Sequence, residues 1–433
     1  MAAVGERPSD GPISGANGLN MHYLLEPLDV ALFRDGRPFG PEEFLRARLI
    51  SPVPMPRTIY GAFRGLILQH KEILYDDFKG GRNLDRELTR LVGTPARLGD
   101  LRIRGPFLAA ASEDGGRLLL PCPADFVLIG YPDPETGLQR PAPEAALGNY
   151  PADLRPLIPY RYHTSTCRWV ACRPEEPVSY ELEHAILDSA GLREYLTGEG
   201  VRSKPVAEYV YSEPHVGIER STETLRPETG KIYSVDFARL VYRKQAEGGT
   251  RAESAAYVVE VLAPEDCLPE DTVFPVGGER RPFRIRRVPW SAWFGEPLRQ
   301  QVAESLKRSC ADGVCRFRLY LLTPACFDGL EAWRPDLSAL AGGLDLTLVA
   351  AAVPRAIPYS GWDMVMRRPR EGRRLAPAGS VYFVEAKANR DLAASELIEQ
   401  LMKTFWLESV CVDEDFRKMG FGLTLIGGWS YAV

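Results

Sequence analysis

The first patterned stretch of the chain pairs a strand with an amphipathic helix. Apolar residues dominate Met21–Phe33, which predicts a strand, and the Gly- and Pro-containing segment Arg34–Gly40 predicts the turn that ends it. A helix is predicted within Ser51–His70, where Pro56 suits the first turn because its missing N–H is not needed there. A strand followed by a helix therefore opens the folded part of the chain.

The predicted helix has an apolar face and a second face of different composition. At about 100° of rotation per residue, four apolar side chains fall in one stripe: Ile59, Phe63, Leu66 and Ile67. Two arginines and two glycines gather on the opposite side: Arg57, Gly61, Arg64 and Gly65. The helix can therefore bury one face on a sheet and present both arginines outward.

Further segments repeat these two patterns. Amphipathic helices are predicted at Glu296–Arg308 and Ala394–Glu408. Long connections rich in Pro, such as Tyr131–Pro159, exceed simple turns and indicate insertions on a smaller scaffold. Strands are predicted at Leu101–Ala109, Arg117–Leu120, Phe126–Ile129, Ile232–Tyr242, Tyr257–Ala263, Arg316–Leu322, Leu344–Val353, Ser380–Glu385 and Gly422–Gly428.

The order of these elements predicts an α+β fold with two ferredoxin-like (RRM-like) domains. Strand, helix, strand pair, helix, strand is the ferredoxin-like order, and each half of the chain can be interpreted in that order. A length of 433 residues also favours two domains. We expect a flexible tail over residues 1–20, a first domain with large insertions over 21–245, and a second domain over 255–433. The polar segment 246–254 is the expected boundary.

Composition favours a globular protein and gives an ambiguous signal about nucleic acid. Hydrophobic residues make up 45% of the chain and charged residues 26%, which excludes a wholly disordered or coiled-coil protein. The net charge of −5 argues against a nucleic-acid partner. However, 44 of the 53 basic residues are Arg. This excess reflects either GC-rich coding or a need for forked donors that hold phosphates.

Cysteine and histidine usage predicts neither a metal nor a cofactor. The chain has 8 Cys without a C-x-x-C pair and only 5 His, so it lacks the pattern of a zinc ribbon or a thioredoxin-like motif. Two C-x4-C spacings, Cys167/Cys172 and Cys310/Cys315, are weak metal candidates. We expect reduced, mostly buried thiols instead.

The N-terminal residues point to the cytoplasm. Glu6 and Asp10 stand where a signal peptide has its apolar run, and no apolar stretch approaches the length of a membrane span. A cytoplasmic protein without membrane contact is therefore expected.

Motifs of common enzymes are missing from the sequence. It contains no P-loop, no H-E-x-x-H, no G-x-S-x-G elbow and no D-x-D cluster at a strand end. His163 and His215 are the best general-base candidates because both lie in polar segments with aromatic neighbours. Hydrogen bonding or base stacking is the favoured role for both. We therefore expect a protein that is not an enzyme and has no catalytic residues.

Basic residues cluster more than their total suggests. Met366–Arg374 holds five Arg against one Glu, and Glu279–Arg287 can place Arg284 and Arg286 on one strand face. In Tyr160–Trp169, basic and aromatic residues alternate, a composition that suits single-stranded RNA. A solvated surface is the alternative for each cluster.

Glycines beside predicted strands add a further candidate feature. Without a Cβ atom, their backbone N–H groups can approach a phosphate closely. Such glycines mostly serve turns, so each is weak by itself. They are Gly230, Gly420, Gly422, Gly427 and Gly428.

Six phrases, in order along almost the whole chain, carry a family resemblance. They resemble the family of the third subunit of the Cmr complex, a RAMP protein of type III-B CRISPR effectors. The third phrase, His215–Leu240, has the RAMP pattern of an Ile-acid-Arg-Thr run followed by Gly, an aromatic residue and a strand. The phrases are Leu25–Gly40, Ser51–Gly65, His215–Leu240, Val349–Met364, Leu375–Glu385 and Gly420–Trp429.

The resemblance implies a non-catalytic, RNA-binding scaffold with two ferredoxin-like RAMP domains. In the family, this subunit holds the 5′ handle of the crRNA and joins the large polymerase-like subunit to the first backbone RAMP subunit. Target RNA is then met only indirectly. The loop Met366–Arg374 faces either RNA or a protein partner. Expected RNA-contact residues are Arg34, Arg37, Arg57, Arg64, Arg168, His215, Arg220, Gly420 and Gly422.

Two other functions remain open at this point. One is a metal-independent, crRNA-processing endoribonuclease of the same superfamily that uses His163 or His215. The other is a scaffold that contacts only proteins.

Overall fold

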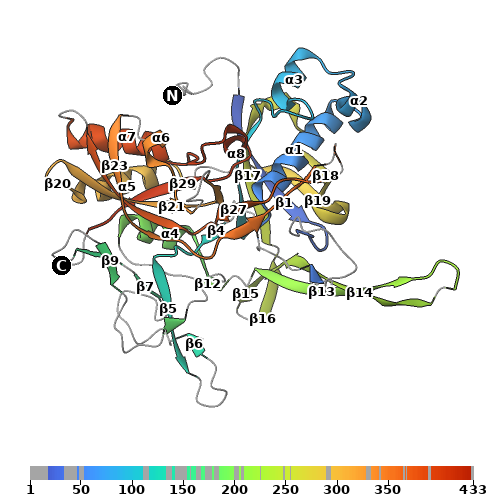
Figure 1. Ribbon diagram of the computed structural model, residues 1–433, viewed down its shortest axis with the longest axis horizontal. Coiled ribbons are helices and arrows are strands. Elements are labelled where there is room, and N and C mark those ends of the chain that lie inside the picture. Colours follow the sequence, from blue (N-terminus) through green and yellow to red (C-terminus); the bar gives the residue numbers. More distant parts are fainter. Residues whose placement is uncertain are drawn as a thin grey trace.

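Two antiparallel sheets with helices packed against them organise the chain, which confirms the α+β class (Figure 1). Gly18–Asn20 already belong to the first strand and not to the expected tail. The computed structural model describes residues 18–33, 46–47, 53–110, 117–132, 139–141, 154–156, 158–161, 167–170, 178–179, 185–198, 204–205, 209–224, 226–246, 249–253, 255–288, 294–327, 333–340, 343–363, 366, 368–388 and 392–430.

The first sheet has eight strands and carries helix α1 (Pro56–His70). Pro56 is the first helical residue, as predicted, and the apolar stripe of α1 is buried toward this sheet. All its neighbouring strands are antiparallel. In spatial order they are β12 (Lys204–Pro205), β11 (Ala185–Leu187), β4 (Arg117–Pro121), β3 (Arg102–Ala110), β17 (Ala255–Pro264), β1 (Gly18–Pro27), β19 (Arg281–Val288) and β18 (Asp271–Val276).

The second sheet lies against α5 (Glu296–Arg308) and α7 (Ala394–Phe405), both of which contact its strands β21 and β29. The predicted apolar side of α7 is buried, from Leu397 to Phe405. Neighbouring strands are again antiparallel. In spatial order they are β29 (Thr424–Gly428), β21 (Val314–Leu321), β28 (Val381–Ala388) and β23 (Leu344–Ala352), with β20 (Cys310–Ala311) pairing to β21.

A long hairpin of β13 (Val210–Arg220) and β14 (Pro227–Leu240) projects from these sheets (Figure 1). Its root is held because Val235 and Phe237 are buried with Val30 and Leu32. The phrase that resembles the RAMP pattern thus forms this hairpin.

Smaller elements complete the fold. The short helices are α2 (Tyr75–Gly80), α3 (Arg86–Val92), α4 (Ser189–Thr197), α6 (Leu337–Leu340), α8 (Glu414–Lys418), η4 (Glu265–Cys267) and η5 (Gly278–Arg280). The short strands are β2 (Arg46–Ala47), β5 (Phe126–Pro132), β6 (Gln139–Pro141), β7 (Leu154–Pro156), β8 (Ile158–Arg161), β9 (Cys167–Val170), β10 (Val178–Ser179), β15 (Tyr242–Ala246), β16 (Gly249–Glu253), β22 (Ala325–Cys326), β24 (Ile357–Tyr359), β25 (Trp362–Asp363), β26 (Arg368–Pro369) and β27 (Arg373–Ala376).

The first sheet continues past the boundary expected at residues 246–254. Strands β17, β18 and β19 follow that segment, yet β17 lies between β3 and β1 and β19 pairs with the other side of β1. This polar segment contains the end of β15 and the whole of β16, which pair with each other. The extent of each domain stays a prediction.

Side chains from both sheets share one core, and a buried polar group helps to join them. Asp125, just after β4, is almost completely buried and lies 3.6 Å from the guanidinium of Arg318 on β21. Tyr195 on α4 donates a hydrogen bond to its carboxylate at 3.1 Å. Because burial outweighs the effect of Arg318, the pKa of Asp125 is raised to about 6.

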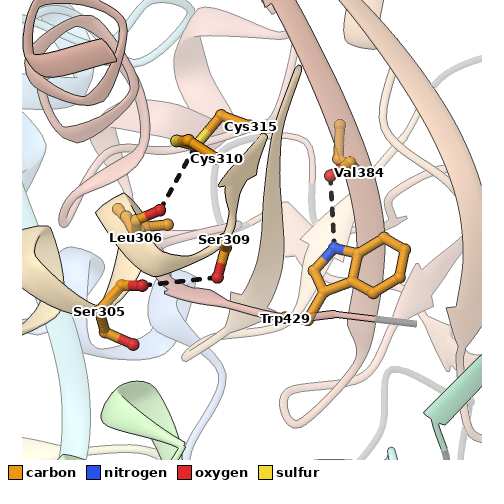
Figure 2. The surroundings of a disulfide bond; sticks show 7 residues. All are labelled: Ser305, Leu306, Ser309, Cys310, Cys315, Val384 and Trp429. Atoms are coloured by element: carbon orange, nitrogen blue, oxygen red, sulfur yellow. Dashed lines mark hydrogen bonds between the residues drawn. A yellow bond between two sulfur atoms is a disulfide. The ribbon is translucent and has the colours of Figure 1, made fainter. Parts of the chain in front are cut away.

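One of the two C-x4-C pairs is a disulfide, which corrects the expectation of reduced thiols (Figure 2). Cys310 on β20 lies directly opposite Cys315 on β21, because the turn between them uses Asp312 and Gly313 with φ of 52° and 72°. Figure 2 shows the bond beside Leu306 at the end of α5. Four other cysteines are buried, as expected: Cys122, Cys267, Cys326 and Cys411.

Candidate nucleic-acid interface

Arg57 lies in the first turn of α1, where aromatic rings from the second half of the chain surround it. Its guanidinium carbon is 5.8 Å from the ring centre of Tyr359 and 5.5 Å from that of Phe416. Phe421 completes the aromatic wall, with its ring 5.7 Å from Tyr359 and 4.9 Å from Phe416. Each of these cation–π contacts stabilises the guanidinium by about 0.5–2 kcal/mol.

We call this group the Arg57 site: Arg57, Tyr359, Phe416 and Phe421, with Gly361 and Arg370 at its edge. Gly361 follows β24, and a Cβ added to it would lie 3.5 Å from Cδ of Arg370 and 3.6 Å from Cδ of Arg57. Arg370 pairs with Asp363 at 3.0 Å. Burial raises the pKa of Tyr359, so its phenol stays neutral while its ring packs against Arg57.

The guanidinium of Arg57 has no counter-charge among the described residues. Its Nε atom is buried and has no hydrogen-bond partner there. Arg57 as a whole is half-buried, so its guanidinium loses part of its hydration, and the aromatic rings offset only part of that loss. The site therefore has the chemistry of an anion receptor.

The N-terminal end of α1 adds to the positive potential around Arg57. Met55, at the cap position, contributes no side-chain hydrogen bond to the first turn, and that turn contains no acidic residue. The dipole of this 15-residue helix places partial positive charge next to Arg57. Helix end and guanidinium thus favour the same kind of ligand, such as a phosphate.

Arginines on β19 provide a contrast. Arg284 pairs with Asp271 at 2.6 Å, and Arg286 pairs with Glu26 at 3.1 Å. Arg287 pairs likewise with Glu265 at 2.8 Å. Most of the basic cluster predicted at Glu279–Arg287 is therefore neutralised by carboxylates of the protein itself.

Arg64 is used within the protein. Its Nε donates to the carbonyl of Val92 at 2.6 Å, and Nη2 donates to the carbonyl of Thr94. Its guanidinium carbon also lies 4.9 Å from the ring centre of Phe78. Burial lowers the pKa of Arg64. These contacts fasten the end of α3 to α1.

Gly420 and Gly422 serve close packing and bring Phe421 into the Arg57 site. Their φ angles are 87° and 67°, which L side chains rarely adopt. A Cβ on Gly420 would lie 2.8 Å from the carbonyl oxygen of Gly105 on β3, and one on Gly422 would lie 2.7 Å from Sγ of Cys411. Protein atoms, and not an open approach for a phosphate, occupy the space beside both glycines.

His215 and Arg220 lie on the projecting hairpin, away from the Arg57 site. His215 Nε2 is 2.8 Å from a carboxylate oxygen of Glu213, which also accepts a hydrogen bond from Arg239. These two partners lower the pKa of Glu213 to about 2. The ring of His215 lies 4.5 Å from that of Phe237, and Arg220 is exposed near the tip.

Several expected residues fall outside this description. Arg34, Arg37 and His163 lie outside the described residues. Arg168 belongs to β9, but its side chain is not described. Of the expected contacts, the structure brings together Arg57 and the Gly420–Gly422 segment.

Sequence reasoning missed the aromatic part of the site. Tyr359, Phe416 and Phe421 come from β24, α8 and the segment after α8. The only available signal was that Tyr359 and Phe421 stand within phrases quoted for the family resemblance. Their meeting with Arg57 depends on long-range packing, which no local pattern reveals.

Within the described ranges, no three or more His, Cys, Asp or Glu side chains form a group that could hold a metal ion. A search of the same residues finds no helix long and apolar enough to cross a membrane.

A model of the family described as "CRISPR-associated protein (Cas_Cmr3)" matches residues 23–429. The chain belongs to this family. The match spans both sheets and the Arg57 site, and it confirms the resemblance at the level of a Cmr protein. No curated protein matches this Cas_Cmr3 chain.

Solved structures give weaker likenesses to this Cas_Cmr3 chain. A chain of a type III-B Cmr-beta complex bound to cognate target RNA and AMPPnP is 14% identical, with a TM-score of 0.43 and coverage of 92% of this chain and 94% of the other. A chain of a Cmr-beta complex bound to cognate target RNA is 15% identical, with a TM-score of 0.43 and coverage of 84% of this chain and 86% of the other. A chain of a Csm3–Csm4 subcomplex of a type III-A interference complex is 9% identical, with a TM-score of 0.31 and coverage of 84% of this chain and 92% of the other. Scores this low do not establish a shared fold.

Proposed function

We propose that the chain is a non-catalytic, RNA-binding scaffold subunit of a type III-B CRISPR Cmr complex and that it holds the 5′ handle of the crRNA at the Arg57 site. Membership of the Cas_Cmr3 family supports the complex. The observation that carries the RNA contact is the guanidinium of Arg57, which has aromatic neighbours but no anion among the described residues.

A phosphodiester of single-stranded RNA supplies what this site lacks. Its oxygens can accept from the guanidinium of Arg57, and the start of α1 favours the same negative charge. Arg370 is already paired with Asp363. It therefore adds positive charge that attracts the phosphate, but it contributes less to direct binding than Arg57. A protein of net charge −5 can bind RNA here because the binding depends on local potential.

The strand order supports two ferredoxin-like units in this proposal. Counting along the chain, β1, β3, β17 and β19 lie in the order 4-1-3-2, and so do β21, β23, β28 and β29. The first unit then closes with β19, and residues 111–254 form an insertion between its second and third strands. Each unit departs from the pattern at one crossover. In the first unit, β18 stands between β17 and β19 where a helix is expected, and in the second the four-residue helix α6 stands between β21 and β23 in place of a full helix.

The proposed partners follow from the same function. The chain joins the large polymerase-like subunit to a backbone RAMP subunit, and it meets target RNA only through the crRNA. It works in the cytoplasm, without a cofactor and without membrane contact.

The experiment that tests this function replaces the unpaired arginine. Arg57→Ala should weaken binding of RNA that carries the handle by roughly 10- to 100-fold, because a hydrogen-bonded charge contributes about 1.5–3 kcal/mol. Arg57→Lys should retain part of the affinity. Binding is measured by fluorescence anisotropy at two salt concentrations.

Arg284→Ala is the matched control, because Arg284 is exposed and already paired with Asp271. It should leave binding within about twofold of the original protein, since surface pairs contribute little. Equal losses for Arg57→Ala and Arg284→Ala would contradict a handle site at Arg57.

One observation favours the endoribonuclease as a second candidate. His215 contacts a carboxylate, which is the arrangement that orients a general base. If the chain cleaves repeat RNA, His215→Ala should abolish cleavage, and gel analysis of the products would show it. RNA that stays intact with the original protein rules this candidate out.

A further inference from the structure

Gly361 lies where the side chains of two arginines meet at the edge of the Arg57 site. A Cβ added to it would be in van der Waals contact with Cδ of Arg57 and with Cδ of Arg370, at 3.6 and 3.5 Å. Burial raises the pKa of Tyr359, whereas Arg57 and Arg370 both act to lower it, so both cations lie near the same phenol. The site thus brings two guanidinium groups within reach of one anion.

The two arginines differ in their counter-charges. Arg57 has aromatic neighbours, and its buried Nε atom has no hydrogen-bond partner among the described residues. Arg370 instead pairs with Asp363 at 3.0 Å, and its side chain is 44% exposed. Ion pairs that are exposed to this extent contribute little to stability. Arg370 can therefore exchange its partner at a small cost in free energy.

The backbone around Arg370 is held independently of this ion pair. The backbone N–H of Arg370 donates to the carbonyl of Gly361 at 2.7 Å, and its carbonyl accepts from Oγ of Ser360 at 2.9 Å. Asp363 also accepts a hydrogen bond from the backbone N–H of Met366 at 2.9 Å. Asp363 thus keeps a donor if the guanidinium leaves, and the exchange requires only a change of rotamer in Arg370.

An RNA phosphate bound to Arg57 would compete with Asp363 for Arg370. Without RNA, one carboxylate offsets the charge of Arg370 and none offsets that of Arg57 among the described residues. A phosphodiester that accepts hydrogen bonds from Arg57 places a second negative charge beside the side chain of Arg370. Its oxygens can accept from both forked guanidinium groups at once.

We propose that Asp363 is an internal competitor of RNA: it holds the guanidinium of Arg370 in the free chain, and a phosphate bound at Arg57 takes that guanidinium over. This inference rests on the proposed function, because it requires RNA at the Arg57 site. Arg370 then becomes a second phosphate contact only when RNA is bound, and Asp363 lowers the affinity of the site.

The first test removes the competing charge from the full-length chain. Asp363→Asn keeps an oxygen that can accept from Met366 and should tighten binding of RNA that carries the handle about two- to fivefold. Asp271→Asn is the matched control, because it makes the same change in net charge and releases Arg284, an exposed arginine on β19. It should change the affinity by less than about 1.5-fold, since salt screens distant charges. Fluorescence anisotropy measures both variants.

Arg370→Ala tests whether Asp363 acts through Arg370. It should weaken binding and reduce the slope of log affinity against log salt concentration by about 0.7, the value for one phosphate contact of a single strand. In the Arg370→Ala background, Asp363→Asn should give less than about half of its gain, because no guanidinium remains to be released. Circular dichroism checks the folding of each variant. The salt slopes of the original chain and Arg370→Ala decide the question even if Asp363→Asn fails to fold.

Three results would overturn the internal competitor. One is RNA binding that Asp363→Asn leaves unchanged or weakens, because Asp363 would then only position Arg370. Another is a gain that is equal or larger without Arg370, which would make Asp363 a simple repulsive charge. The third is a salt slope that Arg370→Ala does not alter. Failure of the proposed function looks different, because Arg57→Ala would then leave RNA binding intact.

Discussion

Arg57 and Arg284 differ in what surrounds their guanidinium groups, and this difference is the reason for placing the proposed RNA contact at Arg57. Arg284 lies in a basic run, yet Asp271 accepts two hydrogen bonds from it at 3.0 and 2.6 Å. Arg57 stands alone in the sequence but has a buried Nε atom without a partner among the described residues. Clustering of Arg in the sequence is therefore a poorer guide to binding than the supply of nearby carboxylates.

Asp125 gives a residue-scale prediction about pH. Its pKa of about 6 in the folded protein lies above the ordinary value of 3.8, so the folded state holds this proton more tightly. Its contribution to the free energy of unfolding is therefore greatest below the ordinary pKa and falls as pH rises toward 6. Between pH 4 and 7, Asp125 should lower the free energy of unfolding by about 2–3 kcal/mol.

Asp125→Asn should remove this pH dependence, because Asn does not titrate. Urea unfolding of both proteins at several pH values measures the difference between their stabilities. Parallel curves for the two proteins across this range would show that Asp125 does not titrate there.

At the scale of elements, periodic patterns were sufficient for the helices that lie on sheets. The stripes of α1 and α7 and the strands that begin at Leu101, Arg316 and Gly422 were predicted and are confirmed to within a few residues. Two polar segments have pairings that local polarity does not predict. Residues 242–246 pair with 249–253 as β15 and β16, and Asp312–Gly313 form the turn that brings Cys310 opposite Cys315.

The segment after α8 supports a prediction at this scale. Gly420→Ala should destabilise the fold by about 2–4 kcal/mol, because a positive φ and overlap with the backbone of β3 act together. Gly81→Ala is the control, since Gly81 has φ of 67° but open space around it. It should cost only about 1 kcal/mol.

Thermal unfolding followed by circular dichroism measures both variants. Gly420→Ala should also weaken RNA binding, because the segment that it strains positions Phe421 in the Arg57 site. If the two alanine variants lose the same stability, the close contact with β3 contributes nothing.

At the scale of the whole molecule, contacts distant in sequence determine the folded unit. The first sheet takes its central strand β17 from beyond a long insertion, and one core contains side chains of both sheets. Arg318 on β21 also donates to the carbonyl of Gly428 at 2.9 Å while it lies beside Asp125. The Arg57 site forms only where α1 meets β24 and α8, so the proposed RNA contact depends on both halves of the chain.

Fragments that end on either side of β17 test this organisation. A fragment of residues 18–290 contains the complete first sheet, whereas residues 18–250 lack β17, β18 and β19. Without β17, strands β3 and β1 lose the partner that lies between them, so the shorter fragment should show no cooperative unfolding transition. The longer one should show such a transition by circular dichroism, although its surface for the second sheet is uncovered. Equal transitions in both fragments would mean that residues 18–250 fold as a unit, and the sheet would then not depend on strands beyond the expected boundary.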